Sequence, residues 1–342
     1  MKDFDRLRIR FMQFGGWRLI VQYARMGVLW IGVKEIIRCA IKGKSMKTVY
    51  PKITQRVDEI LWEKYGPSKS PLKGDYPRAQ QVITDTESLP SSEVGGSKSP
   101  FKGDLEGRIW FCWLQGLDHA PELVHACLKS LRSLPDTRVI VVDIDNYRDY
   151  IEFPDYILEK YHKGYIPHAN MSDMLRLALL SKYGGVWIDA TVLCTYSDVH
   201  REFWRSILDS DFYIYRYIKN GRVNGISNWF IAAKQGNVIV DEVLQLLYAY
   251  WKDYNCVVDY YMMHLFIGWS AKRHPEYFRM MPKGNSYHAI MLGGALGKVY
   301  NEKAWNNLTD HVLFHKMTYR HTERAKSLEG SYYNHIIKEF AE

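Results

Sequence analysis

Three charged side chains that lie close together in the sequence have the chemistry needed to bind a phosphorylated ligand. Asp173 and Arg176 are three residues apart, so a helix would place them on one face, and Asp189 ends a short apolar run. Carboxylate oxygens are ligands that hard cations prefer, and a guanidinium donates paired hydrogen bonds to phosphate or hydroxyl groups. The simpler alternative for Asp173 and Arg176 is an intrahelical ion pair, worth a few tenths of a kcal/mol.

The sequence around these side chains predicts a helix, a glycine stop and a buried strand. Apolar residues at helical spacing predict a helix over residues 170–183, which Gly184 and Gly185 would end. Residues 186–188 form a continuous apolar run, as expected for a strand that is buried on both faces. Ligands bind beyond the carboxyl ends of the strands in an open α/β sheet, so Asp189 stands where chemistry is expected.

The surrounding sequence alternates between strand and helix patterns. Residues 108–113 and 138–143 predict strands, and residues 120–134 between them predict a helix with Pro121 in its first turn. This alternation predicts a parallel α/β sheet. Beyond Asp189 we expect strands at 212–217 and 229–233, helices at 238–251 and 259–272, a short strand or turn at 312–316, and a terminal helix at 332–340.

The central pattern resembles that of a known enzyme family. The runs SDMLR at 172–176 and YGGVWID at 183–189 resemble the motif of DxD-type sugar transferases, in particular the bacterial capsular polysaccharide synthesis glycosyltransferases. The resemblance implies an α/β fold of the GT-A type, with a Rossmann-like, mostly parallel sheet flanked by helices. It covers roughly residues 107–320, because it continues through WLQG at 113–116, NWFIA at 228–232 and HK at 315–316.

The DxD position departs from the family pattern, because it reads Asp189-Ala190-Thr191 and lacks the second carboxylate. By resemblance, Asp189 is expected to coordinate a divalent cation, Mn²⁺ or Mg²⁺, which neutralises the leaving diphosphate. Thr191 and His315 are the further candidate metal ligands. One alternative is that the diphosphate is bound with little contribution from a metal ion, and Lys and Arg side chains supply the positive charge. The other is that Asp189 only caps the turn after its strand.

The resemblance also assigns residues to the sugar and the acceptor. Asp173 and Arg176 are expected to hold the sugar hydroxyls and the part of the donor next to the diphosphate. Asn228 is expected to face the sugar or the acceptor. Asp259 is a candidate acceptor contact or base, although it stands where it would equally serve as a helix N-cap. Together with Asp189, these residues are the candidate catalytic set.

The nucleotide is expected beyond the first two strands. Trp113 is placed to stack on the base, Gln115 to read its edge, and Asp143 to bind the ribose. His315 and Lys316 are expected to contact the diphosphate, because imidazole suits a metal or phosphate and lysine carries a compact charge. The alternatives are a core tryptophan, a turn-capping aspartate and a structural histidine.

The function implied by the resemblance is transfer of a sugar from a nucleotide-sugar, expected to be UDP-linked, to a capsular or other cell-surface glycan. A lipid-linked acceptor and retention of configuration at the sugar carbon are expected. Two alternatives stay open. One is a non-catalytic subunit that binds a nucleotide or glycan in a degenerate site, and the other is a phosphosugar transferase.

The N-terminal part of the chain predicts a separate segment with its own surface chemistry. Residues 1–65 carry 14 Lys/Arg against 6 Asp/Glu, which accounts for the whole net charge of +8. Residues 19–41 predict a basic amphipathic helix, which would bind an anionic membrane surface or pack on the catalytic domain or a second subunit. Residues 66–106 predict a Ser/Pro/Gly/Lys-rich linker with a short duplicated motif, and residues 107–342 predict the GT-A-like domain.

Composition excludes several other classes of protein. The five cysteines are odd in number and form no CxxC pair, which disfavours a disulfide framework or a zinc site and favours a reducing compartment. No recognised nucleic-acid motif accompanies the basic segment, so we expect no nucleic-acid partner. No cleavable secretory signal is evident, and we expect a cytoplasmic protein, peripheral on the inner face of the cell membrane.

Overall fold

The computed structural model describes residues 16–41, 49–66, 107–220, 222–259, 261–320 and 322–340. The chain divides into two compact units. The first unit takes its residues from Met1–Arg78, Glu152–Leu175 and Asp241–His274, and the second from Ala79–Ile151, Arg176–Val240 and Pro275–Glu342. Apart from Gly66, the predicted linker lies outside the described residues. The boundaries 1–65, 66–106 and 107–342 therefore stay predictions.

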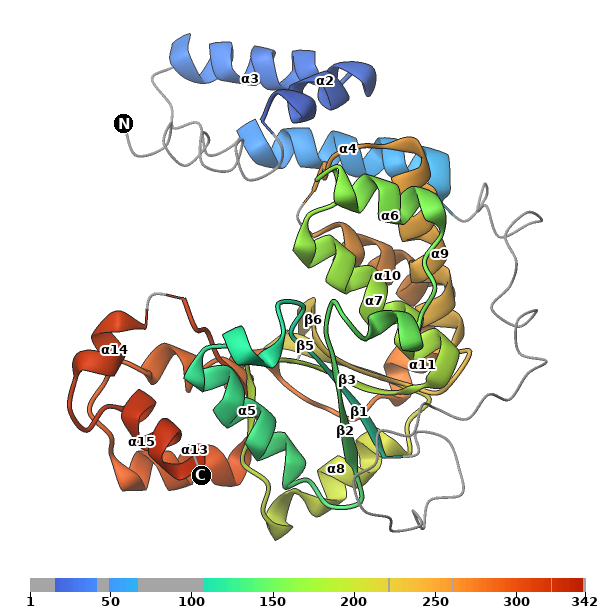
Figure 1. Cartoon of the computed structure of the whole chain (residues 1–342). Helices are drawn as coiled ribbons and strands as arrows, with labels where there is room; N and C mark the ends of the chain where they lie inside the picture. Colours follow the sequence, from blue (N-terminus) through green and yellow to red (C-terminus); the bar gives the residue numbers. More distant parts are fainter. Residues whose placement is uncertain are drawn as a thin grey trace. The chain divides into compact units, whose positions relative to one another are not determined.

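The second unit is built on a sheet with the strand order β2-β1-β3-β6-β5 (Figure 1). Strands β2, β1 and β3 run parallel, and β6 and β5 continue the sheet as an antiparallel pair. A mixed α/β fold with a parallel strand core and flanking helices confirms the coarse prediction from sequence. The bounds are β1 Arg108–Cys112, β2 Arg138–Val142, β3 Gly185–Asp189, β5 Phe212–Lys219 and β6 Arg222–Ala233.

The parallel strands form where the sequence has continuous apolar runs. Four of the five residues of β1 and of β3 are buried, as two-sided coverage of a parallel sheet requires. Gly184 and Gly185 adopt φ values of 66° and 104°, which confirms the predicted glycine stop before β3. A Cβ on Gly185 would lie 2.7 Å from the carbonyl oxygen of Arg108, so the glycine allows β3 to approach β1 closely.

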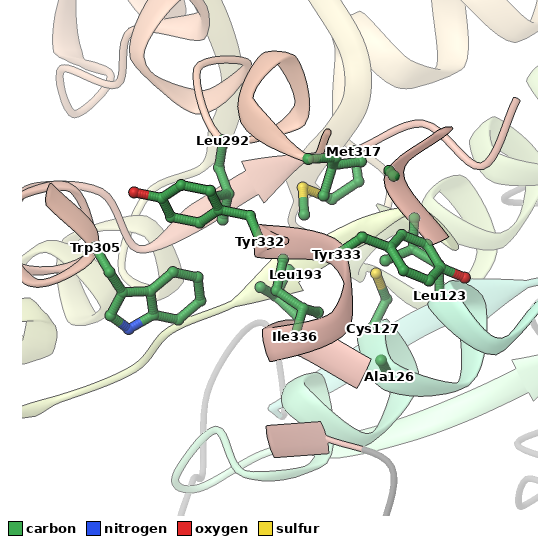
Figure 2. Packing of buried hydrophobic residues seen from close by; sticks show 12 residues of the cluster. Leu123, Ala126, Cys127, Leu193, Leu292, Trp305, Met317, Tyr332, Tyr333 and Ile336 are labelled. Atoms are coloured by element: carbon green, nitrogen blue, oxygen red, sulfur yellow. The ribbon is translucent and has the colours of Figure 1, made fainter. Parts of the chain in front are cut away.

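A second, two-stranded sheet pairs β4 (Val192–Cys194) antiparallel with β7 (Phe314–Lys316). An apolar cluster covers it, with side chains from β4, from the crossover helix α5 (Glu122–Arg132) and from the C-terminal helices (Figure 2). Leu193 of β4 and Met317, the residue after β7, belong to this cluster. Its buried members are Leu123, Ala126, Cys127, Leu193, Leu292, Leu296, Trp305, Met317, Ala325, Tyr332, Tyr333 and Ile336.

Short helices connect the strands of the second unit and follow β7. Most of them are one or two turns long. Their bounds are η3 Leu117–His119, η4 Tyr147–Asp149, η5 Asp198–His200, α8 Arg201–Leu208, α11 Pro275–Met280, α12 Ser286–Ala289, η6 Gly293–Ala295, α13 Glu302–His311, α14 Glu323–Ser327 and α15 Tyr332–Phe340.

The described part of the first unit is helical. Trp62 packs edge-on against Trp269 with ring centroids 5.0 Å apart, and the Tyr65 hydroxyl donates to Asp253 at 2.5 Å. Two long helices cross the division between the units: α7 between Leu175 and Arg176, and α9 between Val240 and Asp241. The bounds are α2 Trp17–Arg25, α3 Leu29–Ile41, α4 Val49–Tyr65, α6 Asp155–His162, α7 His168–Tyr183, α9 Val238–Asp253 and α10 Met262–Arg273.

The single amphipathic helix predicted over residues 19–41 is wrong, because the structure has two helices there. Gly27 adopts φ 70°, and its N–H donates to the Ala24 carbonyl at 3.0 Å. The Val28 N–H reaches back to the Tyr23 carbonyl at 2.9 Å. This pair of bonds is a Schellman motif, which ends α2 at the glycine before α3 begins. Among the helices that the structure describes, none combines the length and apolar character that crossing a bilayer requires.

Candidate active site

The candidate site lies at the carboxyl edge of the parallel strands. Asp189 ends β3 and pairs in register with Cys112, the last residue of β1. The loops that follow β1 and β2 are tied together at the same edge. The Trp113 N–H donates to the Val142 carbonyl at 3.1 Å, and the Ile144 N–H donates to the Leu114 carbonyl at 3.2 Å. The predicted nucleotide residues Trp113, Gln115 and Asp143 therefore share an edge with Asp189.

The Asp189 carboxylate is held by two hydrogen bonds and a further ion pair. The Trp187 indole N–H donates to Oδ1 at 2.9 Å, and Arg176 Nη2 lies 3.6 Å from the same oxygen. The Lys316 Nζ donates to Oδ2 at 3.0 Å. Burial acts to raise the pKa of Asp189, but the charges of Lys316 and Arg176 and the indole hydrogen bond outweigh it and lower the pKa. The carboxylate is therefore ionised at neutral pH.

Arg176 is fixed from three sides. Its Nη1 donates to the backbone carbonyl of Asn228 at 2.5 Å, and its guanidinium carbon lies 4.9 Å from the centroid of the Trp187 ring. With its contact to Asp189, these interactions leave the Arg176 side chain only 7% exposed. The strand β6 runs antiparallel to β3, with Phe230 opposite Ile188, and thereby brings Asn228 to the same edge. The predicted residues Arg176, Asp189 and Asn228 are thus brought together.

Lys316 lies between the first and third residues of the Asp189-Ala190-Thr191 run. Its Nζ donates to Thr191 Oγ1 at 2.5 Å as well as to Asp189 Oδ2. The register of the small sheet sets this position, because Lys316 pairs with Val192, and the Met317 N–H donates to the Thr191 carbonyl at 2.8 Å. One cation therefore bridges the two positions that carry the carboxylates in a DxD motif.

His315 is not brought together with Asp189. Successive side chains on a strand point to opposite faces, so His315 faces away from the side that Lys316 faces. Its side chain is fully buried, and its Nε2 is hydrogen-bonded to Thr195 Oγ1 at 2.9 Å. Burial, together with the nearby His200, lowers the pKa of His315 to about 3, so the imidazole is neutral at physiological pH. The structural alternative for His315 agrees with this geometry.

The three residues predicted to bind the nucleotide differ in their burial and hydrogen bonding. Asp143 Oδ1 accepts from the backbone N–H groups of Asp145 and Asn146, both at 3.0 Å, so this carboxylate caps its own turn. Trp113 is half-buried and packs edge-on against Tyr319, and its buried indole nitrogen has no hydrogen-bond partner among the described residues. Gln115 is exposed. Contacts of these side chains with a nucleotide stay predictions.

Asp173 and Asp259 belong to the first unit, whereas the other predicted site residues belong to the second. Both are buried. Asp173 lies in α7, the helix that also carries Arg176. Asp259 Oδ1 accepts from the Tyr261 N–H at 2.6 Å in the turn that leads into α10, which agrees with the helix-capping alternative. Their roles toward a sugar or an acceptor stay predictions.

The residues around Asp189 do not fit a divalent cation in their present arrangement. Within the described residues, no group of three or more His, Cys, Asp or Glu side chains could hold a metal ion. Asp189 is the acidic residue at the DxD position, Thr191 is neutral, and Lys316 bonds to both. The predicted third ligand, His315, is bonded to Thr195.

Two contributions to the site were not predicted from sequence. Trp187 was assigned only to a buried apolar run, yet its indole N–H donates to Asp189 two residues later. Side chains two residues apart on a strand lie on the same face, so the spacing of Trp187 and Asp189 could have predicted this contact. Asn228 contributes its backbone carbonyl, and because every residue has one, the residue type at this position does not predict the contact.

Comparison with known proteins places these motifs in a family. A family model described as "Capsular polysaccharide synthesis protein" matches residues 78–336. The O-glycosyltransferase braB of Annulohypoxylon truncatum is 29% identical over 158 residues, which cover 42% of this chain and 37% of that protein, so the chain spans little more than a third of that relative. The solved PaToxG glycosyltransferase matches with a TM-score of 0.35 and 14% identity, over 52% of this chain and 74% of that one. Because the family model spans most of its length, this chain belongs to the capsular polysaccharide synthesis protein family.

Proposed function

We propose that this chain is a glycosyltransferase of the GT-A type, which moves a sugar from a nucleotide-sugar donor to a capsular or other cell-surface glycan. In this reaction the bond between the anomeric carbon and the diphosphate oxygen breaks, and a bond from that carbon to an acceptor hydroxyl oxygen forms. The diphosphate leaves with an additional negative charge, and the acceptor hydroxyl loses its proton. A site for this reaction therefore needs positive charge where the diphosphate departs.

The observation that carries the proposal is the convergence of two cations on Asp189 at the carboxyl edge of the parallel strands. Arg176 and Lys316 approach opposite oxygens of the same carboxylate, which holds both side chains in one orientation. A lysine positioned in this way supplies a compact positive charge for a diphosphate, and the buried arginine adds to the positive charge at the site. Family membership supports the same assignment.

For the donor we propose a UDP-linked sugar whose base stacks on Trp113 and whose ribose lies near Asp143. Trp113 and Asp143 follow the ends of two adjacent parallel strands, and binding beyond strand ends is typical of α/β folds. Gln115 is exposed in the loop after β1 that also carries Trp113, and its amide is available there to the edge of a base. We further propose that configuration at the sugar carbon is retained, which proton NMR of the product would decide.

Nucleotide release tests the proposal directly. The full-length protein is incubated with a panel of UDP-, GDP-, TDP- and CMP-linked sugars, and the released nucleotide is quantified. We expect UDP from at least one donor, and loss of that release in Asp189→Asn. Asp198→Asn is the matched control, because the Asp198 side chain is 83% exposed and lies outside the site. Release of a nucleoside monophosphate from a UDP-linked donor would indicate phosphosugar transfer instead. Nucleotide binding without release from any donor would contradict the enzyme and favour a binding subunit.

We also propose that the acceptor is lipid-linked and that the first unit contacts an anionic membrane surface. Its helices α2 and α3 expose Trp17, Trp30 and Ile41, whose side chains are 77%, 70% and 80% exposed. Arg25 and Lys34 are exposed on the same two helices. Exposed aromatic residues beside basic residues favour the interface of an anionic bilayer.

Vesicle co-sedimentation tests the membrane contact. The full-length chain should sediment with vesicles that contain phosphatidylserine, and much less with pure phosphatidylcholine. The double variant Trp17→Ser with Trp30→Ser should reduce this binding, whereas Val199→Ser, a control at an exposed apolar residue of the second unit, should leave it unchanged. Equal binding to both vesicle types, or none, would contradict the contact.

A further inference from the structure

We infer that Lys316 takes the place of the divalent cation at this site, so that the donor diphosphate is bound by Lys316 without a metal ion, while Arg176 orients Asp189. The inference rests on the proposed function, because it assigns a mode of diphosphate binding to the same site. It starts from the position of the Lys316 ammonium, which lies between Asp189 Oδ2 and Thr191 Oγ1 at 3.0 Å and 2.5 Å.

The oxygen atoms that a metal would use are already engaged. Asp189 Oδ1 accepts from the Trp187 indole and lies near the Arg176 guanidinium, and Oδ2 accepts from Lys316. Thr191 Oγ1, the remaining oxygen at the DxD position, also accepts from Lys316. A divalent ion binds oxygen ligands at roughly 2.0–2.2 Å, so an ion bridging Asp189 and Thr191 would have to displace the ammonium.

The charge at the site agrees with a bound anion. Arg176 and Lys316 together carry two positive charges against the single negative charge of Asp189. In a DxD site, one divalent ion faces two carboxylates, and the sum of those charges is zero. The present arrangement keeps one net positive charge among these three side chains, directed at the edge where the diphosphate is expected.

The geometry of Lys316 leaves it able to contact a phosphate. An ammonium carries three N–H donors, and the bonds to Asp189 and Thr191 use two of them. The Lys316 side chain is 25% exposed, and its backbone is held by the small sheet. Arg176, by contrast, is nearly fully buried and is tied to Asn228 and Trp187. We therefore assign direct diphosphate contact to Lys316, and orientation of Asp189 to Arg176.

Calorimetric titration of the full-length protein with UDP, in EDTA and then in Mn²⁺, tests the inference. UDP should bind in EDTA with an affinity within about twofold of that in Mn²⁺. Lys316→Met should weaken binding about 10- to 100-fold, the range expected for loss of a charge-assisted hydrogen bond, and Lys316→Arg should restore part of it. Lys303→Met is the control, because Lys303 is exposed on α13. Melting temperatures of all variants report whether they are folded.

A paired substitution tests the inference in the opposite direction. Thr191→Asp combined with Lys316→Gln restores two carboxylates and removes the ammonium, so UDP binding by this variant should become Mn²⁺-dependent. Wild-type binding that falls more than about tenfold in EDTA and returns with Mn²⁺ would overturn the inference and leave the proposed function standing. Absence of binding to any nucleoside diphosphate, with or without metal, would overturn both.

Discussion

The most informative single perturbation is Asp189→Asn, because one change of atom type alters three contacts. An asparagine has one oxygen and one nitrogen where the carboxylate has two oxygens. One side of the amide must therefore direct N–H donors either at the Lys316 ammonium or at the Trp187 indole and Arg176. The variant also removes the negative charge that lies 3.6 Å from Nη2 of the nearly buried Arg176.

The size of the effect follows from burial. Removing one partner of a buried ion pair costs about 3–5 kcal/mol. The side chains of Asp189 and Lys316 are 24% and 25% exposed, so solvent screens part of this loss and we expect about 2–3 kcal/mol. For a domain of this size the melting temperature should fall by about 5–10 °C. Asp198→Asn, at an exposed acid, should change stability by less than about 0.5 kcal/mol.

The pH dependence of the stability difference between wild type and Asp189→Asn shows whether the difference comes from the Asp189 charge. The folded state lowers the pKa of Asp189 below its ordinary value of 3.8, so its contribution is complete above that pH and is lost as the pH falls through the folded value. Thermal melts of wild type and Asp189→Asn, followed by circular dichroism, should differ most at pH 7, and the difference should narrow as the pH falls below about 3.8. A difference below about 0.5 kcal/mol at pH 7, or one that persists unchanged at pH 3, would refute the reasoning.

Two further predictions concern single groups. Trp187→Phe should lower the free energy of unfolding by about 1.5–3 kcal/mol, because it removes the hydrogen bond to the Asp189 carboxylate. Trp204→Phe should cost less, since the buried Trp204 indole has no hydrogen-bond partner in the part of the chain that the structure describes. Equal losses in urea melts would contradict the role of the Trp187 indole. Burial, together with the nearby charges of Asp259 and Glu59, raises the pKa of Asp58 to about 7, so its ionisation lowers stability as the pH rises from about 4 to 7. Asp58→Asn should therefore gain stability relative to wild type, and the gain should be larger at pH 8 than at pH 5. A variant that is less stable than wild type at pH 8 would contradict this reasoning.

Local patterns predicted the central part of the molecule well. The helix expected over residues 170–183 is α7, and the glycine stop and the strand that ends in Asp189 follow as expected. These elements depend on short-range effects: helical periodicity, the φ values open to glycine, and a continuous apolar run. The prediction over residues 19–41 was wrong because the amphipathic period continues past Gly27, and periodicity alone does not show where the backbone turns.

The sequence by itself determined which residues are available for chemistry and the strand end at which Asp189 stands. Only the tertiary structure decided how they combine, because the partners of Asp189 come from α7, β3 and β7, and the last of these lies 127 positions along the chain. His315 and Lys316 were predicted as a pair, but strand alternation directs one into the core and the other to Asp189. The register of β4 with β7 places the Lys316 ammonium between Asp189 and Thr191. A pairing between distant strands depends on the packing of the whole core, and adjacent residue types do not report it.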